Sequence, residues 1–256
     1  MLLSLKPGIT YGPVRSRRLG RSMGINLMPG TYKHCSFNCI YCHYGWTRII
    51  TTDMEPYRDD LPTRTEVVAA VEKALCSPDD FEYITFSGNG EPTLHPDFPE
   101  LVKDTGQLRD KYRPQAKIGL LSNSTGLERE SVRASISGID FPMFKLDAGS
   151  ETTFVAMNRP ARGVAFYAIV DRLSALSGIL IQTVLIDGTP NNTSDEELDA
   201  YFALLSRIHP REVHIYSIDR PVPQTDIRLV PPERLRQIAD KGKQKTGIEI
   251  KAFYPR

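Results

Sequence analysis

The 256-residue chain lacks several features that would assign it to a broad class of protein. No apolar run reaches the roughly 18 residues that a transmembrane helix needs, and the first residues are too short an apolar stretch for a signal peptide. Both absences predict a cytoplasmic protein without membrane contact. The net charge is only +1, so the chain lacks the overall basic charge of a typical nucleic-acid-binding domain, although this does not exclude a local basic patch. The sequence also has no repeat of solenoid period and no low-complexity tract.

Cysteine is scarce, and its placement is uneven. The chain has 4 cysteines, and three of them (Cys35, Cys39 and Cys42) lie within one short loop. So few cysteines, crowded together, exclude a disulfide framework. Thiolates at this spacing suit one soft metal ion or an iron–sulfur cluster. A [4Fe-4S] cluster normally takes four thiolates, so three would leave one iron open to a substrate or a cofactor.

Two histidines next to this loop leave an alternative open. A zinc loop would take its fourth ligand from His34 or His43, which flank the three cysteines. The remaining cysteine, Cys76, ends a predicted helix. We expect it to pack as a small hydrophobic residue rather than to bind a metal.

Helical and strand patterns alternate along the chain. Thr63 with Glu66, and Ser194 with Glu197, have the spacing of a capping box at the start of a helix. The predicted helices cover residues 63–75, 97–112, 126–136, 163–176 and 195–207, with a last one opened by Pro231 and Pro232. The six main predicted strands cover residues 24–28, 83–87, 118–121, 143–147, 179–185 and 213–216.

This alternation predicts βαβ units and a parallel sheet. Six strands are too few for a closed eightfold barrel, so the predicted fold class is α/β, an open, partial (β/α)6 barrel. We expect residues 23–256 to form a single domain, preceded by a basic N-terminal arm over residues 1–22. The arm contains Arg15, Arg17, Arg18 and Arg21. These arginines are either solvated or placed near anionic groups of a cluster or substrate.

Unusual polar residues follow the predicted strands, each where a strand ends. In parallel barrels the carboxyl ends of the strands carry the active site, so we predict that these residues share one edge. Glycine lets the backbone approach a ligand closely, and a glutamate can accept hydrogen bonds from a cationic amine. The residues in question are the cysteine loop, Gly88-Asn89-Gly90-Glu91-Pro92, Ser122 and Asn123, Lys145 and Asp147, and Ser217, Asp219 and Arg220.

Several of these segments resemble the radical S-adenosylmethionine (SAM) superfamily. Cys35-x3-Cys39-x-Tyr41-Cys42 is similar to its cluster motif, and Gly88–Glu91 is similar to its Gly-Gly-Glu-Pro motif, with Asn89 in place of a glycine. The chain further resembles a group of "Fe–S oxidoreductases" that are distantly similar to the enzymes of wyosine tRNA-base synthesis. That likeness runs from about residue 10 to 250 and includes Tyr11–Arg21, Phe86–Pro96, Lys145–Gly149, Asn158–Pro160 and Asp219–Pro221.

The resemblance implies two cofactors and a set of residues that bind them. The cofactors are a [4Fe-4S] cluster and SAM, which chelates the open iron. The implied cluster ligands are Cys35, Cys39 and Cys42. The implied SAM ligands are Gly88, Asn89, Gly90 and Glu91 for the methionine amino group, Tyr41 for the adenine, Ser122 and Asn123 for the ribose or the carboxylate, Lys145 to pair with that carboxylate, and Asp147 to orient it.

The resemblance also implies an activity, with the substrate left open. Reductive cleavage of SAM would give methionine and a 5′-deoxyadenosyl radical that abstracts hydrogen from a substrate. The electron would come from a low-potential donor such as a ferredoxin or a flavodoxin. Two alternatives within the superfamily are modification of an RNA base and installation of a radical on a partner protein. A non-enzymatic metal-binding or electron-transfer module is the alternative from a different class.

Overall fold

The computed structural model describes residues 2–254, and the chain forms two compact units that we describe in turn. The first unit comprises residues 4–36 and 47–143, and the second comprises residues 2–3, 37–46 and 144–254. The chain passes from the first unit to the second within strand β7 (Phe141–Lys145). Over residues 2–254, none of the helices has the length and apolar character needed to cross a membrane.

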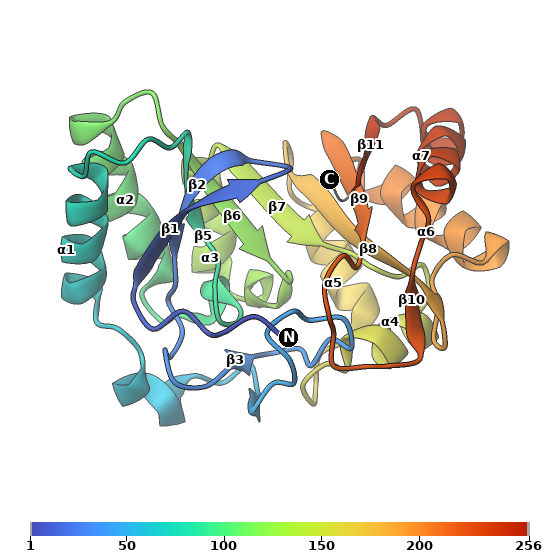
Figure 1. Cartoon of the computed structure of the whole chain (residues 1–256), viewed down its shortest axis with the longest axis horizontal. Coiled ribbons are helices and arrows are strands. Elements are labelled where there is room, and N and C mark those ends of the chain that lie inside the picture. Colours follow the sequence, from blue (N-terminus) through green and yellow to red (C-terminus); the bar gives the residue numbers. More distant parts are fainter. Residues whose placement is uncertain (1, 255–256) are drawn as a thin grey trace. The chain divides into compact units, whose positions relative to one another are not determined.

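Three parallel strands form the centre of the first unit (Figure 1). β2 (Gly20–Ile25) pairs with β5 (Tyr83–Phe86), and β5 pairs with β6 (Lys117–Ser122). β1 (Thr10–Ser16) is antiparallel to β2, so much of the predicted arm forms a strand hairpin of this unit. The shorter elements of the unit are β3 (His34–Cys35), β4 (Ile49–Ile50), η1 (Glu55–Asp60), η2 (Pro92–Leu94), η3 (Thr125–Glu128), α3 (Glu130–Ser135) and η4 (Ile136–Gly138).

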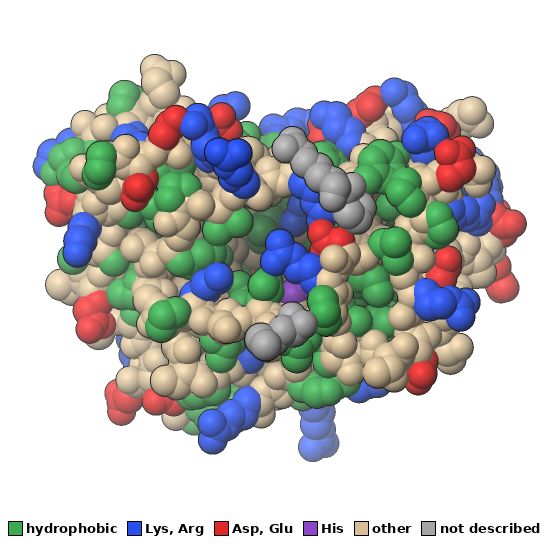
Figure 2. All heavy atoms as spheres, viewed as in Figure 1, with side chains coloured by type: hydrophobic (Ala, Val, Ile, Leu, Met, Phe, Trp, Pro, Cys, Tyr) green, Lys and Arg blue, Asp and Glu red, His purple; other side chains and the backbone are tan. Residues whose placement is uncertain are grey.

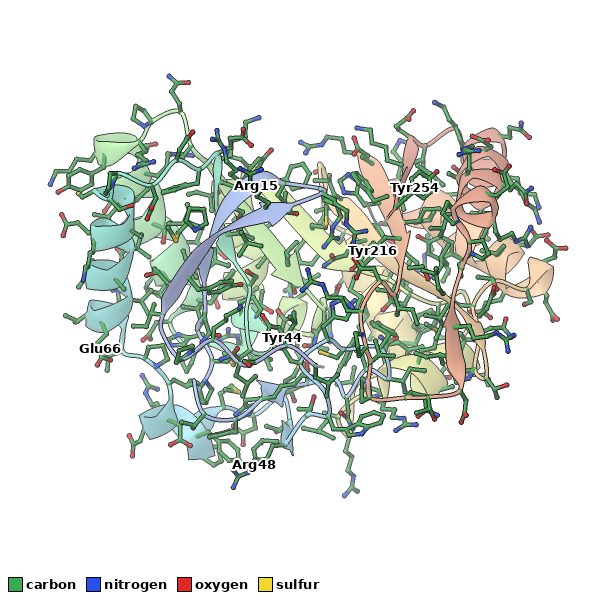
Figure 3. All side chains as sticks on the ribbon, viewed as in Figure 1. Arg15, Tyr44, Arg48, Glu66, Tyr216 and Tyr254 are labelled. Carbon is green, nitrogen blue, oxygen red and sulfur yellow. The ribbon has the colours of Figure 1, made fainter. Side chains whose placement is uncertain are left out.

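Two long helices complete the first unit. α1 (Arg64–Leu75) begins with the predicted capping box, in which Thr63 Oγ1 accepts from the Glu66 N–H and the Glu66 carboxylate accepts from the Thr63 N–H. Figure 3 shows Glu66 at the first turn of α1. α2 (Phe98–Tyr112) buries Phe98, whose ring lies edge-on to Phe86 of β5 with 5.4 Å between the centroids. The buried faces of α1 and α2 give the unit its core.

The second unit has the same pattern of parallel strands and helices. β9 (Glu212–Ser217) lies between β8 (Leu180–Gly188) and β11 (Ile250–Phe253), and all three are parallel. β10 (Ile227–Leu229) is antiparallel to β8. The helices are α4 (Glu151–Asn158), α5 (Phe166–Ser174), α6 (Asp195–Ile208) and α7 (Pro232–Thr246). Lys241 and Lys245 of α7 pair with Asp195 and Asp199 of α6, and Figure 2 shows basic and acidic side chains intermixed over these helices.

The second capping box forms only in part. Ser194 caps α6 by accepting from the Glu197 N–H, as predicted. The Glu197 carboxylate instead accepts from the Gly149 N–H at 2.6 Å and from the Ser150 N–H at 3.1 Å. Two backbone donors from a distant loop therefore occupy the carboxylate that would have closed the box.

Within each unit the parallel strands place their carboxyl ends at a common edge. In the first unit these ends lead into the cysteine loop after β2, the glycine segment after β5 and Asn123 after β6. The alternation of parallel strands and helices confirms the predicted α/β class.

Candidate functional site

The three cysteines of the loop are divided between the two units. Cys35 belongs to the first unit, and Cys39 and Cys42 belong to the second. All three are free thiols; Cys35 and Cys39 are buried, and Cys42 is half-buried. Within either unit by itself, residues 2–254 contain no group of three His, Cys, Asp or Glu side chains close enough to hold a metal ion.

In the first unit, the Cys35 sulfur accepts a hydrogen bond from the amide of Asn123, with 3.5 Å between Nδ2 and Sγ. The same Nδ2 donates to Ser36 Oγ at 2.8 Å, and Asn123 Oδ1 accepts from the Thr125 hydroxyl at 2.7 Å. Every polar atom of the Asn123 amide is thus bonded within the unit. The amide is held in one orientation, with its nitrogen toward the sulfur.

The Glu91 carboxylate connects the loops that follow β5 and β6. It is fully buried and accepts from the Thr93 N–H, from the Ser122 hydroxyl at 2.8 Å and from the Asn123 N–H. Burial raises the pKa of Glu91, and these hydrogen bonds oppose that rise. Glu91, Ser122 and Asn123, which the sequence placed on different strand ends, therefore meet in one hydrogen-bonded cluster.

The segment Gly88-Asn89-Gly90 packs closely against its own unit. A Cβ on Gly90 would lie 1.7 Å from the His34 carbonyl oxygen, directly before Cys35. Gly88 has φ +120°, and a Cβ there would lie 2.6 Å from Asn26 Oδ1. The Asn89 side chain is buried and bonded to the backbone of Lys6 and Pro29. These glycines admit the protein's own backbone and side chains, and their predicted role in ligand binding stays a prediction.

In the second unit, Tyr41 and Asp147 form a buried pair. The Tyr41 hydroxyl donates to Asp147 Oδ2, while Asp147 Oδ1 accepts from the Val184 N–H at 2.8 Å. Burial, followed by the negative charges of Asp147 and Cys39, raises the pKa of Tyr41 well above its usual value. Lys145 Nζ lies 3.5 Å from Asp147 Oδ2 and 5.1 Å from the centre of the Tyr41 ring. The structure thus brings Tyr41, Lys145 and Asp147 together within the second unit.

Asn158 joins this cluster, and the sequence did not identify it as a site residue. Its Nδ2 lies 2.7 Å from the Tyr41 hydroxyl, 2.9 Å from Asp147 Oδ2 and 3.4 Å from the Cys39 sulfur. The only sequence signal was the Asn158-Arg159-Pro160 segment, which we noted as part of the family resemblance without a role.

The two histidines that a zinc site would use, His34 and His43, each contact another side chain. The His34 ring is fully buried and edge-on to Tyr57, with 4.7 Å between centroids. His43 Nε2 lies 3.7 Å from Asp219 Oδ1. Cys76 is exposed at the C-terminal end of α1, so the prediction that it packs in the core is wrong.

The arginines of the N-terminal segment do not share one environment. Arg21 pairs with Asp80 and Glu82 within the first unit, whereas Arg15 lies exposed on β1 (Figure 3).

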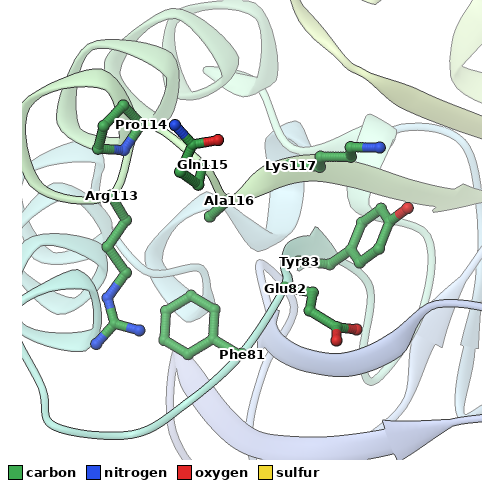
Figure 4. A pocket seen from close by; sticks show the side chains of 8 residues that line it. All are labelled: Phe81, Glu82, Tyr83, Arg113, Pro114, Gln115, Ala116 and Lys117. Carbon is green, nitrogen blue, oxygen red and sulfur yellow. The ribbon is translucent and has the colours of Figure 1, made fainter.

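A cavity of about 660 Å³ lies near Glu82, but it opens at the start of β5 and β6, away from their carboxyl ends (Figure 4). It is lined by Phe81, Glu82, Tyr83, Arg113, Pro114, Gln115, Ala116 and Lys117.

Comparison with known proteins finds relatives that align with almost the whole chain. A family model for the radical SAM superfamily matches residues 31–205. A UPF0026 protein of Synechocystis sp. is 31% identical over 94% of this chain and 94% of its own length. A protein of Brachyspira hyodysenteriae named GTPase Obg is 28% identical over 96% of this chain, which spans 35% of that longer protein.

Solved structures share the fold at low sequence identity. A radical SAM methyltransferase from Sphaerobacter thermophilus has a TM-score of 0.66 at 15% identity, over 92% of this chain and 66% of that chain. TYW1 with a lysine–pyruvate adduct bound has a TM-score of 0.59 at 16% identity, over 89% and 75%. Native anSMEcpe with bound AdoMet (SAM) also has a TM-score of 0.59 at 16% identity, over 90% and 63%. The likeness confirms the predicted fold class.

Proposed function

Because the chain belongs to the radical SAM superfamily and to the UPF0026 family, we propose that it is a radical SAM enzyme. The cofactors of the superfamily are a [4Fe-4S] cluster and SAM. In this proposal Cys35, Cys39 and Cys42 bind the cluster. The substrate from which hydrogen is abstracted is unidentified, and the electron comes from a low-potential donor such as a ferredoxin or flavodoxin in the cytoplasm.

The observation that carries the proposal is the environment of the two buried cysteine sulfurs. Cys35 accepts an amide N–H from Asn123, and Cys39 accepts one from Asn158. An N–H donor stabilises a thiolate more than a thiol, because the thiolate carries the negative charge. Cluster ligands are thiolates, and hydrogen bonds to their sulfurs are a regular feature of iron–sulfur sites. The donor set therefore fits a cluster.

When bound, the cluster supplies the electron that splits SAM into methionine and a 5′-deoxyadenosyl radical. The residues of this chain hold SAM in place. Lys145 pairs with the methionine carboxylate, and Asp147, which lies 3.5 Å from Lys145 Nζ, orients the lysine. The backbone of Tyr41 meets the adenine edge.

The methionine amino group is bound by the Gly88–Glu91 segment. Glu91 Oε2 accepts from the Asn123 N–H and keeps a second lone pair for an ammonium donor. In this assignment Asn89 contributes its backbone, because its side chain is bonded to Lys6 and Pro29. Ser122 and Asn123 bind the ribose hydroxyls or the methionine carboxylate of SAM.

The test is an anaerobic assay for 5′-deoxyadenosine by mass spectrometry, with reconstituted, reduced protein and SAM. We expect product with wild-type protein and with Cys76→Ala, because Cys76 is exposed and lies outside the loop. We expect no product with Cys39→Ala. Wild-type protein that holds a complete cluster and still leaves SAM intact with every reductant would refute the enzyme assignment and favour an electron-transfer module.

A further inference from the structure

Asn158 holds a position between two anionic groups of the second unit. Its Nδ2 lies 3.4 Å from the Cys39 sulfur and 2.9 Å from Asp147 Oδ2. A carboxylate and a thiolate only accept hydrogen bonds, so the nitrogen and not the oxygen of the amide must face them. The Tyr41 hydroxyl, 2.7 Å from the same nitrogen, donates its own proton to Asp147. One amide group therefore serves the sulfur and the carboxylate together.

The backbone around Asn158 holds the side chain in register with Cys39. The Asn158 carbonyl accepts from the Asn38 N–H at 2.9 Å, and the Met157 carbonyl accepts from the Ile40 N–H at 3.0 Å. The end of α4 thus contacts the cysteine loop on both sides of Cys39. Arg159 ends the helix in the left-handed region at φ 44°. The Asn158 amide is placed by these backbone contacts and has little freedom to turn away.

The two ends of the Asn158 amide have opposite effects on the stability of the fold, because its nitrogen donates to the buried Asp147 carboxylate and its oxygen has no partner among the described residues. Asn158 is 1% exposed, and its Oδ1 is buried without a hydrogen-bond partner among the described residues. Burying an unpartnered amide oxygen destabilises a protein. A leucine of similar size would remove that oxygen. The asparagine lowers the stability of the fold through its buried oxygen, and it supplies an N–H donor to the Cys39 sulfur.

We propose that Asn158 is a positioning residue that raises the reduction potential of the cluster through its N–H···S hydrogen bond to Cys39. The inference rests on the proposed function, since it requires Cys39 to be a cluster ligand. A hydrogen bond to a ligating sulfur withdraws electron density and so stabilises the reduced, more negative cluster. The Asp147 carboxylate acts in the opposite sense, because a nearby negative charge disfavours an added electron. The amide offsets that repulsion by donating to both groups.

The experiment compares the cluster potential in Asn158→Leu with that in a matched control. Asn192 is the control because it is also a buried asparagine of the second unit, donating to the Asp147 carbonyl oxygen at 2.6 Å and accepting from the Ile186 N–H. Among residues 2–254, its amide makes no hydrogen bond to a sulfur. Each reconstituted protein is titrated anaerobically and followed by the electron paramagnetic resonance of the reduced cluster. Iron content and urea stability are measured on the same samples.

We expect Asn158→Leu to keep its iron and to titrate at a more negative potential than wild type. At a fixed solution potential its ratio of reduced to oxidised cluster falls about tenfold, which for one electron corresponds to about 59 mV. Asn192→Leu loses stability with an unchanged potential. The serine hydroxyl is too short to replace the amide, so the cluster potential of Asn158→Ser shifts in the same direction as that of Asn158→Leu. Asn158→Ser serves as the test variant if Asn158→Leu does not fold.

A wild-type potential in both Asn158 variants would overturn the inference and leave Asn158 a structural residue. Equal shifts in Asn158→Leu and Asn192→Leu would do the same, because they would follow from lost packing. Failure of the proposed function looks different. Wild-type protein with a cluster that cannot cleave SAM refutes the enzyme but leaves the comparison of potentials intact, whereas protein that binds no cluster overturns both.

Discussion

Replacement of Gly90 by alanine tests whether the glycine segment positions the cysteine loop. The new Cβ would lie 1.7 Å from the His34 carbonyl oxygen and 2.8 Å from its carbonyl carbon. Ordinary contacts of this kind exceed about 3.4 Å, so one backbone segment has to move by well over 1 Å. Overpacking of a close contact costs about 1–3 kcal/mol. Loss of the backbone bridge between His34 and Gly90 adds about 1 kcal/mol for each hydrogen bond. We expect a loss of about 2–5 kcal/mol.

The assay measures urea denaturation and the iron content of anaerobically reconstituted protein. His34 directly precedes Cys35, so we expect Gly90→Ala to lower the iron content as well as the stability. The matched control is Gly106→Ala in α2, where the nearest atom to the new Cβ, Ile118 Cδ1, is 4.0 Å away. Alanine in a helix interior is favoured over glycine by about 0.5–1 kcal/mol, so this variant should be more stable than wild type. A Gly90→Ala protein as stable as wild type with full iron content would refute the reasoning.

Two further predictions concern the second unit. Tyr41→Phe removes a donor to the buried Asp147 carboxylate, so we expect a loss of about 1–3 kcal/mol in thermal denaturation, and wild-type stability would count against the buried pair. Burial alone would raise the pKa of Glu212, but the bonds from Lys251 and His214 outweigh it and leave that pKa below its usual value of 4.5. The resulting stabilisation is present above pH 4.5 and is lost as the pH falls through the lowered pKa. Urea midpoints between pH 6 and 3 should fall less steeply in Lys251→Met, and identical slopes would contradict the assignment.

The helices that the sequence predicted best are those with local start signals. Thr63 and Ser194 cap α1 and α6 as expected, and α7 begins at Pro232. A cap depends on residues three apart, so it is visible in the sequence. α4 (Glu151–Asn158) was missed because it has only 8 residues and a weak amphipathic pattern. Its position depends on the backbone bonds that Asn38 and Ile40 make to its last turn.

Burial and side-chain partners were the points at which sequence reasoning failed. Cys76 was expected to pack because free cysteine is usually buried, but it ends α1 on an exposed surface. Glu197 was expected to close a capping box, but the Gly149 and Ser150 amides occupy its carboxylate. Both errors concern contacts between segments that are distant in the chain. A residue type shows what a side chain can bind, while its neighbours in space decide what it does bind.

The sequence by itself determined the cysteine spacing, the α/β class and the polar residues at the strand ends. Three cysteines within one loop stay close in any fold, because a few residues of chain cannot separate them far. Only the tertiary structure placed the Asn158 amide on Cys39, a contact between residues that are 119 positions apart. The tertiary structure also packs the His34 carbonyl group against Gly90, where a side chain would not fit. Such contacts depend on how helices and strands pack, and no local pattern in the chain records that packing.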